Sequence, residues 1–220
     1  MTVEMPRAES RRRTYRSELR QRQAAETRRR VIEAAVEVFG EYGYQAATFA
    51  QIAKRAGVSV ETVQKHGPKS ALMWAAVEVA SFGVEGRNVD IFTTDIGKPL
   101  LEASDPDQFA TLAGEAALAL HEPAAGVWTA VTGAAHGDRE LRRHLAERLA
   151  EIRGQAENIL RLLAERGWLR TDVPFDDLVE TFCVITSTES YVRFVLVDGK
   201  SREAYKAFIS RVLRDTILAR

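Results

Sequence analysis

Cysteine is almost absent from this chain of 220 residues, in which Cys183 is the only one. A single thiol excludes an intrachain disulfide framework and a cysteine-based zinc site. Because Cys183 lies in the apolar run 182–185, we expect it to be buried and unreactive. Long apolar stretches are also missing, since the longest, 71–84, is interrupted by Glu78 and Ser81 and is too short to span a bilayer. The N-terminus lacks the apolar segment of a secretory signal, so we expect a cytoplasmic protein with no membrane partner.

Motifs of catalysis and of metal binding are missing as well. The four histidines, His66, His121, His136 and His144, have no spacing that suits a metal site. The sequence contains no H-E-x-x-H motif, no phosphate-binding glycine loop and no nucleophile elbow. We therefore expect a protein that is not an enzyme and that holds neither a metal nor a cofactor.

The net charge of zero hides an uneven distribution of charge along the chain. Residues 1–30 contain ten arginines and four glutamates, which leaves +6. Residues 31–72 are balanced, so the remaining 148 residues carry −6. A basic N-terminus on an acidic body suggests a polyanionic partner for the N-terminal region. For residues 1–15 alone, a tail that only improves solubility is an equally good interpretation.

Helical periodicity covers almost the whole chain, with no period-2 strand pattern, internal repeat or long heptad run. Asp105, Asp138 and Ser201 are expected to cap helices, because their side-chain oxygens can accept from backbone N–H groups of the first turn. The sequence therefore predicts an all-α protein. The first expected helix ends at Gly43. The others cover about 48–57, 59–66, 69–84, 106–120, 123–136, 138–166, 174–197 and 201–218, and the segment 85–104 is expected to be irregular.

Two short predicted helices joined by a tight turn carry the most informative pattern. Thr48 and Gln51 form a capping box at the start of the first of them. Ala53, Gly57 and Val63 follow the helix-turn-helix spacing, with a small residue at the helix crossing, a glycine in the turn and an apolar residue between the helices. In this motif the second helix enters the major groove of DNA. The alternative is a helical hairpin in an unrelated bundle.

This part of the chain resembles the tetracycline-repressor (TetR) family over residues 27–72. Beyond residue 72 the resemblance is architectural, a long helical C-terminal domain. It implies a homodimeric, all-helical regulator of transcription, usually a repressor that a small ligand releases from DNA. The residues that carry the resemblance are Thr27-Arg28-Arg29-Arg30-Val31-Ile32-Glu33-Ala34-Ala35, Phe39, Gly43-Tyr44, Thr48, Ile52-Ala53, Ala56-Gly57-Val58-Ser59, Thr62, Pro68-Lys69 and Leu72.

The resemblance also implies a division of the chain and a set of DNA contacts. We expect a basic arm over 1–22, a helix-turn-helix domain over 23–72, and a helical ligand-binding and dimerisation domain over 73–220. Three arginines would reach phosphates or the minor groove, three other side chains would contact phosphates, and the start of the second helix would face the bases. The expected DNA-binding residues are Arg28, Arg29, Arg30, Thr48, Ser59, Val60, Glu61, Thr62, Gln64, Lys65, His66 and Lys69.

Two positions of the recognition helix need separate comment. Glu61 could accept from a cytosine amino group, but a first-turn acid favoured by the helix dipole is the alternative. Gln64 stands where the family usually has a tyrosine, and the phenylalanine that usually follows three residues later is missing from a segment one residue shorter. Gln64 could donate to phosphate or read an adenine edge, and His66 could take part of the packing role.

The C-terminal domain is expected to hold a ligand pocket and a dimer interface. The last two helices would pair across a two-fold axis with those of a partner, since the helix from about 174 is apolar around most of its circumference. The alternatives are ordinary core packing for the pocket residues and a central helix of a monomer. Candidate pocket residues are Trp74, Phe82, Phe109, His121 and Trp128, and candidate interface residues are Phe182, Ile185, Tyr191, Val195, Phe208 and Val212.

These observations predict a ligand-responsive repressor that binds a palindromic, double-stranded operator as a homodimer. The small-molecule effector is expected to be hydrophobic, because the candidate pocket residues are mostly aromatic. The alternative function is a helical ligand-binding or interaction protein whose DNA-binding module has degenerated.

The basic arm gives a first testable prediction. Deleting residues 1–22 should flatten the dependence of log affinity for DNA on log salt, because fewer counterions are released when fewer arginines meet phosphates. The measurement is a series of binding titrations on one duplex at increasing salt. An unchanged slope would show that the arm does not contact DNA.

Overall fold

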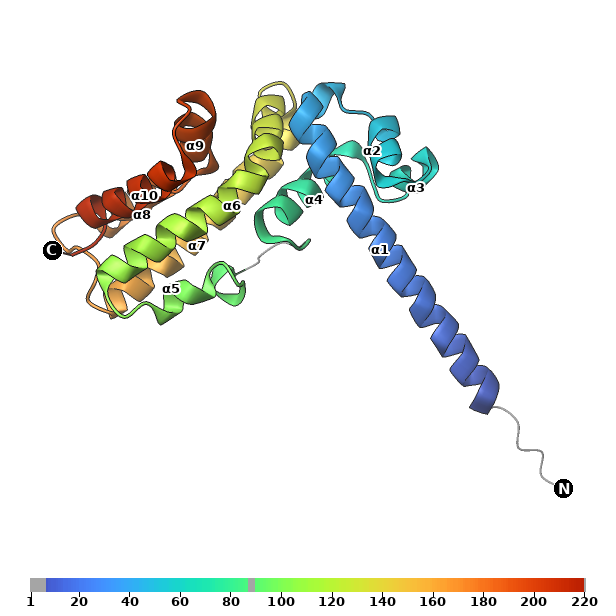
Figure 1. Cartoon of the computed structure of the whole chain (residues 1–220), viewed down its shortest axis with the longest axis horizontal. Helices are drawn as coiled ribbons and strands as arrows, with labels where there is room; N and C mark the ends of the chain where they lie inside the picture. Colours follow the sequence, from blue (N-terminus) through green and yellow to red (C-terminus); the bar gives the residue numbers. More distant parts are fainter. Residues whose placement is uncertain (1–6, 87–89, 220) are drawn as a thin grey trace.

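Helices form nearly all of the structure, a computed structural model that describes residues 7–86 and 90–219, with side chains from residue 19 (Figure 1). Within these ranges the only β pairing is an isolated bridge between Leu169 and Leu218, and the predicted all-α fold is confirmed. No described helix is long and apolar enough to cross a membrane. The elements are α1 (Arg7–Ala46), α2 (Phe49–Ala56), α3 (Val60–Gln64), α4 (Lys69–Phe82), the 3₁₀ turn η1 (Ile91–Thr93), α5 (Lys98–Glu102), α6 (Pro106–Ala135), α7 (Arg139–Glu165), α8 (Phe175–Ile185), α9 (Thr188–Tyr191), the π-helical η2 (Val192–Val197) and α10 (Arg202–Thr216).

The helix starts follow the predicted capping residues. Asp105 accepts from the backbone N–H of Gln108 at 2.8 Å, and Asp138 caps the first turn of α7 in the same way. Ser201 accepts from the backbone N–H of Ala204 at 3.1 Å and begins α10. These short-range bonds need only the local sequence, which explains why they could be predicted.

Three predicted segments differ from the structure. The helices expected on either side of Pro123 form one helix, α6, since packing against α1 and α10 holds it together across the hydrogen bond that the proline removes. The helix expected over 174–197 is interrupted after α8, where Thr186 donates to the carbonyl of Phe182 and Ser187 caps α9. Such local side-chain bonds compete with the helical pattern. The segment 85–104, expected to be irregular, contains η1 and α5.

Two hydrophobic cores hold the chain together, and α6 belongs to both. The first half of α6 packs with α5, α7, α8 and α10 around Phe109, Leu160 and Tyr205. Its second half, through Val127 and Val131, packs with α1, α4 and the short helices α2 and α3. The N-terminal part of α1 projects away from both cores (Figure 1). Of the predicted basic arm, residues 1–6 and the side chains of 7–18 lie outside the described residues.

The contact between α6 and α10 gives a second prediction. A Cβ atom added at Gly114 would lie 2.6 Å from the carbonyl oxygen of Lys206 and 2.7 Å from the hydroxyl of Ser210. Gly114→Ala should therefore lower the free energy of unfolding by roughly 1–3 kcal/mol, because the α10 backbone must move.

Gly133 in the same helix is the matched control, since a Cβ there meets nothing within 4 Å. Gly133→Ala should raise the free energy of unfolding by roughly 0.5–1 kcal/mol, because it removes backbone freedom from the unfolded chain. Urea unfolding of both variants measures the two effects. Equal effects of the same sign would contradict the close approach of α6 and α10.

Candidate DNA-binding surface and ligand cavity

The pair α2 and α3 is a capped helix-turn-helix whose turn depends on one glycine. Thr48 accepts from the backbone N–H of Gln51 at 3.2 Å, and the Gln51 side chain accepts from the backbone N–H of Thr48 at 2.7 Å. Gly57 ends α2 with φ 66°, a left-handed conformation that a side chain disfavours. Val63 is fully buried against Ala53, with relative exposures of 0% and 3%. The second helix is thereby held at a set angle to the first.

The exposed face of α3 carries hydrogen-bonding and cationic groups. Ser59, Gln64 and Lys65 are exposed, and Lys54 is exposed on the last turn of α2. Among the described residues, Lys54 and Lys65 have no carboxylate within ion-pair distance, so both ammonium groups are available to a phosphate. Lys54 was not among the predicted contacts, although a lysine in the last turn of the first helix is a signal that could have found it.

The carboxylate of Glu61 interacts with the N-terminus of α3. Hydrogen bonds from its backbone N–H and from Ser59, together with the nearby charge of Lys65, hold the pKa of Glu61 below its usual value. A first-turn carboxylate is stabilised by the helix N-terminus in this way. This geometry favours the helix-dipole interpretation over a contact with cytosine.

The remaining predicted contacts around the turn are partly engaged within the protein. The Thr48 hydroxyl is occupied by its capping box, and the Thr62 hydroxyl lies 3.1 Å from that of Ser59. Lys69 donates to the carbonyl of Gln45 at 3.2 Å and lies over the ring of Tyr44, 4.8 Å from its centroid. Partial burial lowers the pKa of Lys69. Val60 and His66, also predicted contacts, are half-buried.

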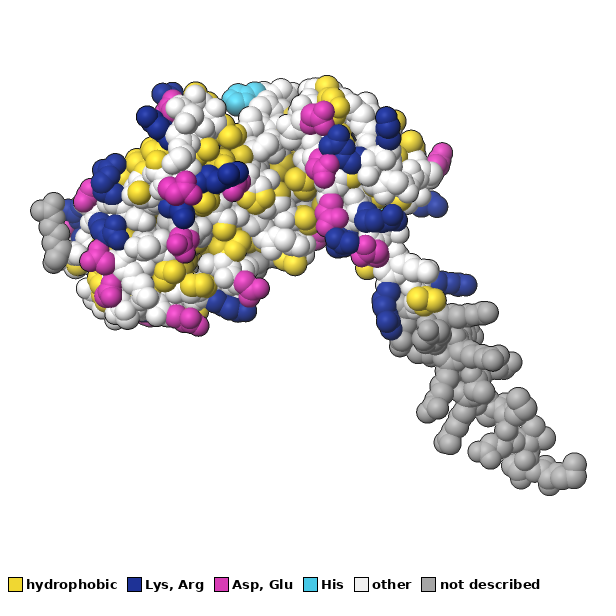
Figure 2. Space-filling model, in the orientation of Figure 1, with side chains coloured by type: hydrophobic (Ala, Val, Ile, Leu, Met, Phe, Trp, Pro, Cys, Tyr) yellow, Lys and Arg dark blue, Asp and Glu magenta, His cyan; other side chains and the backbone are white. Residues whose placement is uncertain are grey.

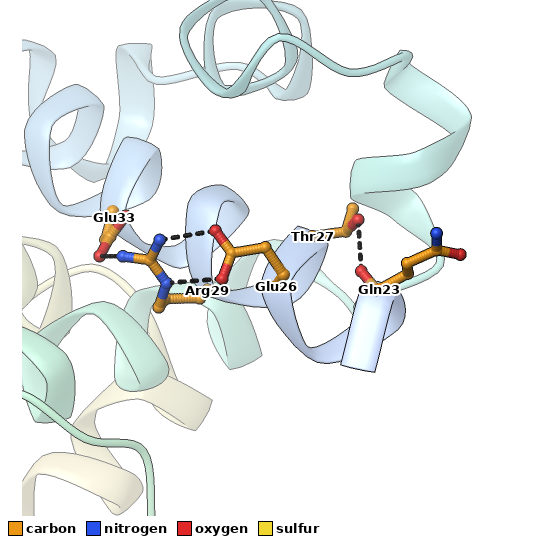
Figure 3. Close-up of polar contacts among 5 residues, drawn as sticks. All are labelled: Gln23, Glu26, Thr27, Arg29 and Glu33. Atoms are coloured by element: carbon orange, nitrogen blue, oxygen red, sulfur yellow. Dashed lines mark hydrogen bonds and ion pairs between the residues drawn. The ribbon is translucent and has the colours of Figure 1, made fainter. Parts of the chain in front are cut away.

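The three predicted arginines of α1 have different surroundings. Arg29 lies between two glutamates, donating to Glu26 at 2.6 and 3.1 Å and to Glu33 at 2.6 Å (Figure 3). Arg28 donates from Nε and Nη2 to one carboxylate oxygen of Glu85, at 2.9 and 2.6 Å, so it ties α1 to the segment after α4. Arg30 is exposed and has no ion pair with a described residue. Of the three, Arg30 is therefore the one whose charge is most available to DNA.

A cavity of about 480 Å³ lies in the C-terminal core between the end of α4, α5, α6, α7 and the segment from α8 to α9. Four of the five predicted pocket residues line it: Phe82, Phe109, His121 and Trp128. The fifth, Trp74, does not line it but borders a separate hollow between α1, α4 and α7, where its indole nitrogen is buried without a hydrogen-bond partner among the described residues. Four of the candidate residues thus share one cavity, because aromatic residues of the middle helices converge there.

Two titratable groups of the cavity wall have shifted pKa values. Burial lowers the pKa of His121 to about 4, and its Nδ1 atom lies 2.9 Å from the hydroxyl oxygen of Tyr205. His121 is therefore neutral near pH 7. Cys183 is half-buried rather than fully buried, and burial raises the pKa of its thiol, which agrees with the expected low reactivity.

Comparison with known proteins agrees with this geometry. Residues 31–66 match the sequence profile described as "Bacterial regulatory proteins, tetR family", which covers the helix-turn-helix. The helix-turn-helix of this chain is therefore of the TetR-family type. In a DNA-binding helix-turn-helix the second helix enters the major groove, and α3 is the second helix here. No curated protein matches the chain in sequence.

Several solved structures share the fold of nearly the whole chain. Their sequence identity to the chain is low, so the likeness shows the fold alone. A protein described as a TetR-family transcriptional regulator from Mesorhizobium loti is 20% identical, with TM-score 0.67 over 88% of this chain and 96% of that one. A transcriptional regulator from Saccharomonospora viridis in complex with choline is 19% identical, with TM-score 0.67 over 89% and 100%. The transcriptional regulator FadR from Bacillus subtilis in complex with stearoyl-CoA is 19% identical, with TM-score 0.67 over 84% and 96%.

The predicted dimer face is only partly exposed in the protomer. Phe182 and Tyr191 are buried in the protomer, with exposures of 7% and 3%, and so contribute to its own core. Ile185, Val195, Phe208 and Val212 are half-buried. The strongly exposed apolar side chains of this region, which the prediction missed, are Val184, Leu196 and Val197 at 60%, 58% and 66%. Hydrophobic side chains reach the surface at this end of the molecule (Figure 2).

The sequence analysis also missed a cation in the cavity wall. Arg148 is 8% exposed and lines the cavity from α7. A signal was present, since Arg148 follows the buried Leu141 by seven residues and so lies on the apolar side of the helix. Within the described ranges, no group of three histidine, cysteine, aspartate or glutamate residues is placed to hold a metal ion.

Burial of His121 gives a third prediction. Because its pKa is lower in the folded protein, at about 4, than the ordinary 6.5, the unfolded chain binds more protons between these values. The group's contribution to stability is complete above about pH 6.5 and is lost as the pH falls toward 4, at up to roughly 1.4 kcal/mol per pH unit.

His121→Asn, which keeps a partner for Tyr205, should reduce the loss of stability between pH 7 and pH 5, measured by urea unfolding. His136→Asn is the control, since His136 is exposed, and should keep the wild-type pH dependence. If His121→Asn shows the wild-type pH dependence too, His121 is not the group responsible.

Proposed function

We propose that the protein is a homodimeric, ligand-responsive transcriptional repressor that binds a palindromic operator through α3. The observation that carries this proposal is the capped helix-turn-helix with polar and cationic side chains on the exposed face of its second helix. Gln64 can pair with an adenine edge or donate to a phosphate, and Lys65 can reach a phosphate or a guanine. We also propose DNA contacts for the other DNA-binding residues that the sequence analysis named.

A response to ligand is supported by the position of the cavity. Ser81 and Phe82, at the end of α4, line it, and α4 packs against α1 in the DNA-binding core. A ligand that fits only one position of α4 would shift the equilibrium between DNA-binding and released states. Solved relatives bind choline and stearoyl-CoA, and we propose that this chain also takes a small molecule, one with a large apolar part.

The dimer and the location of the protein complete the proposal. The exposed Val184, Leu196 and Val197 would be covered by a second copy, because contiguous exposed apolar side chains mark interaction surfaces. Two copies would place two recognition helices on successive half-sites of the operator. A regulator of this kind acts on DNA in the cytoplasm and catalyses no reaction.

Selection from a random duplex library at about 0.15 M salt is the direct test. An enriched palindrome with half-sites about one helical turn apart supports a sequence-specific dimer and identifies the operator. Salt-sensitive binding without enrichment would point to the altered recognition helix, and the selection would be repeated with Gln64→Tyr. Absence of DNA binding in both proteins would favour the alternative, a ligand-binding protein with a degenerate DNA module.

Lys65 gives a fourth prediction. Lys65→Ala should weaken operator binding and reduce the slope of log affinity against log salt by about 0.9 per half-site, because one counterion fewer is released. Lys98→Ala is the matched control, since Lys98 is exposed but belongs to α5, in the C-terminal core, and pairs with Asp95. Fluorescence anisotropy at several salt concentrations measures both. Equal slopes for wild type and Lys65→Ala would remove Lys65 from the interface.

A further inference from the structure

One edge of a buried guanidinium in the cavity wall has no partner within the protein. The side chain of Arg148 is 9% exposed, and its Nη1 atom donates to Glu151 at 3.0 Å. That is its only hydrogen bond to a described residue, and its Nε atom is buried with no acceptor. A buried donor without an acceptor costs free energy, so a native protein usually supplies one from a ligand, an ion or water.

The geometry of arginine defines what fits that edge. Nε and Nη2 form a planar pair of donors that matches the two oxygens of a carboxylate. Glu151 uses only Nη1, on the other side of the guanidinium. The remaining edge of Arg148 therefore suits a second carboxylate, one that does not come from the protein.

The other charged side chains of the cavity wall, and its histidine, already have partners. Arg153 donates to Glu180 at 2.7 Å, and Glu189 accepts from the indole nitrogen of Trp128 at 2.7 Å. His121 is neutral near pH 7 and interacts with a tyrosine hydroxyl. Arg148 is thus the cation of the lining that is left to recognise a ligand.

The rest of the cavity suits an apolar body. Most of its lining is formed by apolar side chains, which suit an apolar part of a ligand. The volume of about 480 Å³ is large enough for a molecule of a dozen or more non-hydrogen atoms. The apolar residues of the lining include Ile91, Leu100, Phe109, Ala113, Ala117 and Ile159.

We propose that the ligand of this cavity is an apolar monocarboxylic acid whose carboxylate binds the guanidinium of Arg148. The proposal deepens the ligand-responsive function proposed above and rests on it for its regulatory consequence. The guanidinium carbon of Arg148 lies 5.6 Å from the ring centroid of Phe82, the last residue of α4. A carboxylate bound to Arg148 would therefore contact the side chain that lies over Phe82, at the end of the helix that packs against the DNA-binding core.

The test uses the full-length protein and two acids of different shape, decanoate and 1-naphthoate. Each is compared with the alcohol of the same carbon skeleton, decanol or 1-naphthalenemethanol, by isothermal titration calorimetry without DNA. We expect at least one acid to bind about tenfold or more tightly than its alcohol, because a charge-assisted hydrogen bond is lost with the carboxylate. Equal affinities of acid and alcohol, or no binding of either acid, would overturn the proposal.

Substitutions test whether Arg148 causes the preference for the acid over the alcohol. Arg148→Gln should bind acid and alcohol with equal affinity, and Arg148→Lys, which keeps the charge but loses the planar edge, should lose most of the preference. Arg143→Gln on the exposed side of α7 is the control and should behave as wild type. An acid preference that survives in Arg148→Gln would overturn the assignment.

Glu151→Gln separates recognition from misfolding, because it should improve binding. Removing the negative charge of Glu151 leaves the charge of Arg148 to the ligand alone, so the acid should bind more tightly while the alcohol is unaffected. Glu151→Gln with unchanged or weaker acid binding would contradict the proposal.

Titration of the protein–operator complex with the same acid distinguishes the two proposals. If the acid binds the free protein but leaves operator affinity unchanged, the assignment of the cavity stands and the ligand-responsive function fails. If the operator is bound but neither acid is, the function stands and the assignment of the cavity fails.

Discussion

The passage of α6 through both hydrophobic cores is the constraint on which the structure depends. At its centre α6 crosses α1 so closely that a Cβ atom on Gly126 would lie 3.1 Å from the Cα atom of Gly40. Closer to its start, Gly114 lets α10 approach in the same way. Because both crossings are made by backbone against backbone, neither core can slide along α6 without breaking contact. The DNA-binding helices and the cavity are therefore attached to one rigid element.

The buried histidine and arginine and a bridging ion pair lie at the cavity and between the two cores. The cavity wall contains His121 and Arg148, the only buried histidine and arginine among the described residues. Between the two cores, the ion pair of Arg28 with Glu85 joins α1 to the segment after α4. Buried or bridging charges contribute little net stability, since their loss of hydration offsets the attraction. Their positions at the cavity and at the junction of the cores fit the proposed coupling of ligand binding to the position of α4.

The sequence predicted the DNA-binding part of the molecule more closely than the rest. Thr48, Gln51 and Gly57 act within a few residues of the chain, so their caps and turn can be recognised from spacing alone. The pairing of Arg28 with Glu85 joins residues 57 apart in sequence, and no local pattern indicates it. The burial of Phe182 and Tyr191 in the protomer likewise depends on helices distant in sequence.

By itself the sequence determined the helical class, most helix starts, the helix-turn-helix and the exposed face of α3, because capping bonds and periodicity act between neighbouring residues. Only the tertiary structure decided that α6 continues through Pro123, that Trp74 lies outside the cavity and that Arg148 lies inside it. Each of these depends on contacts between helices distant in sequence. Packing can hold a helix across a proline or enclose a charge on an apolar face, and its energy is set by neighbours that no local pattern specifies.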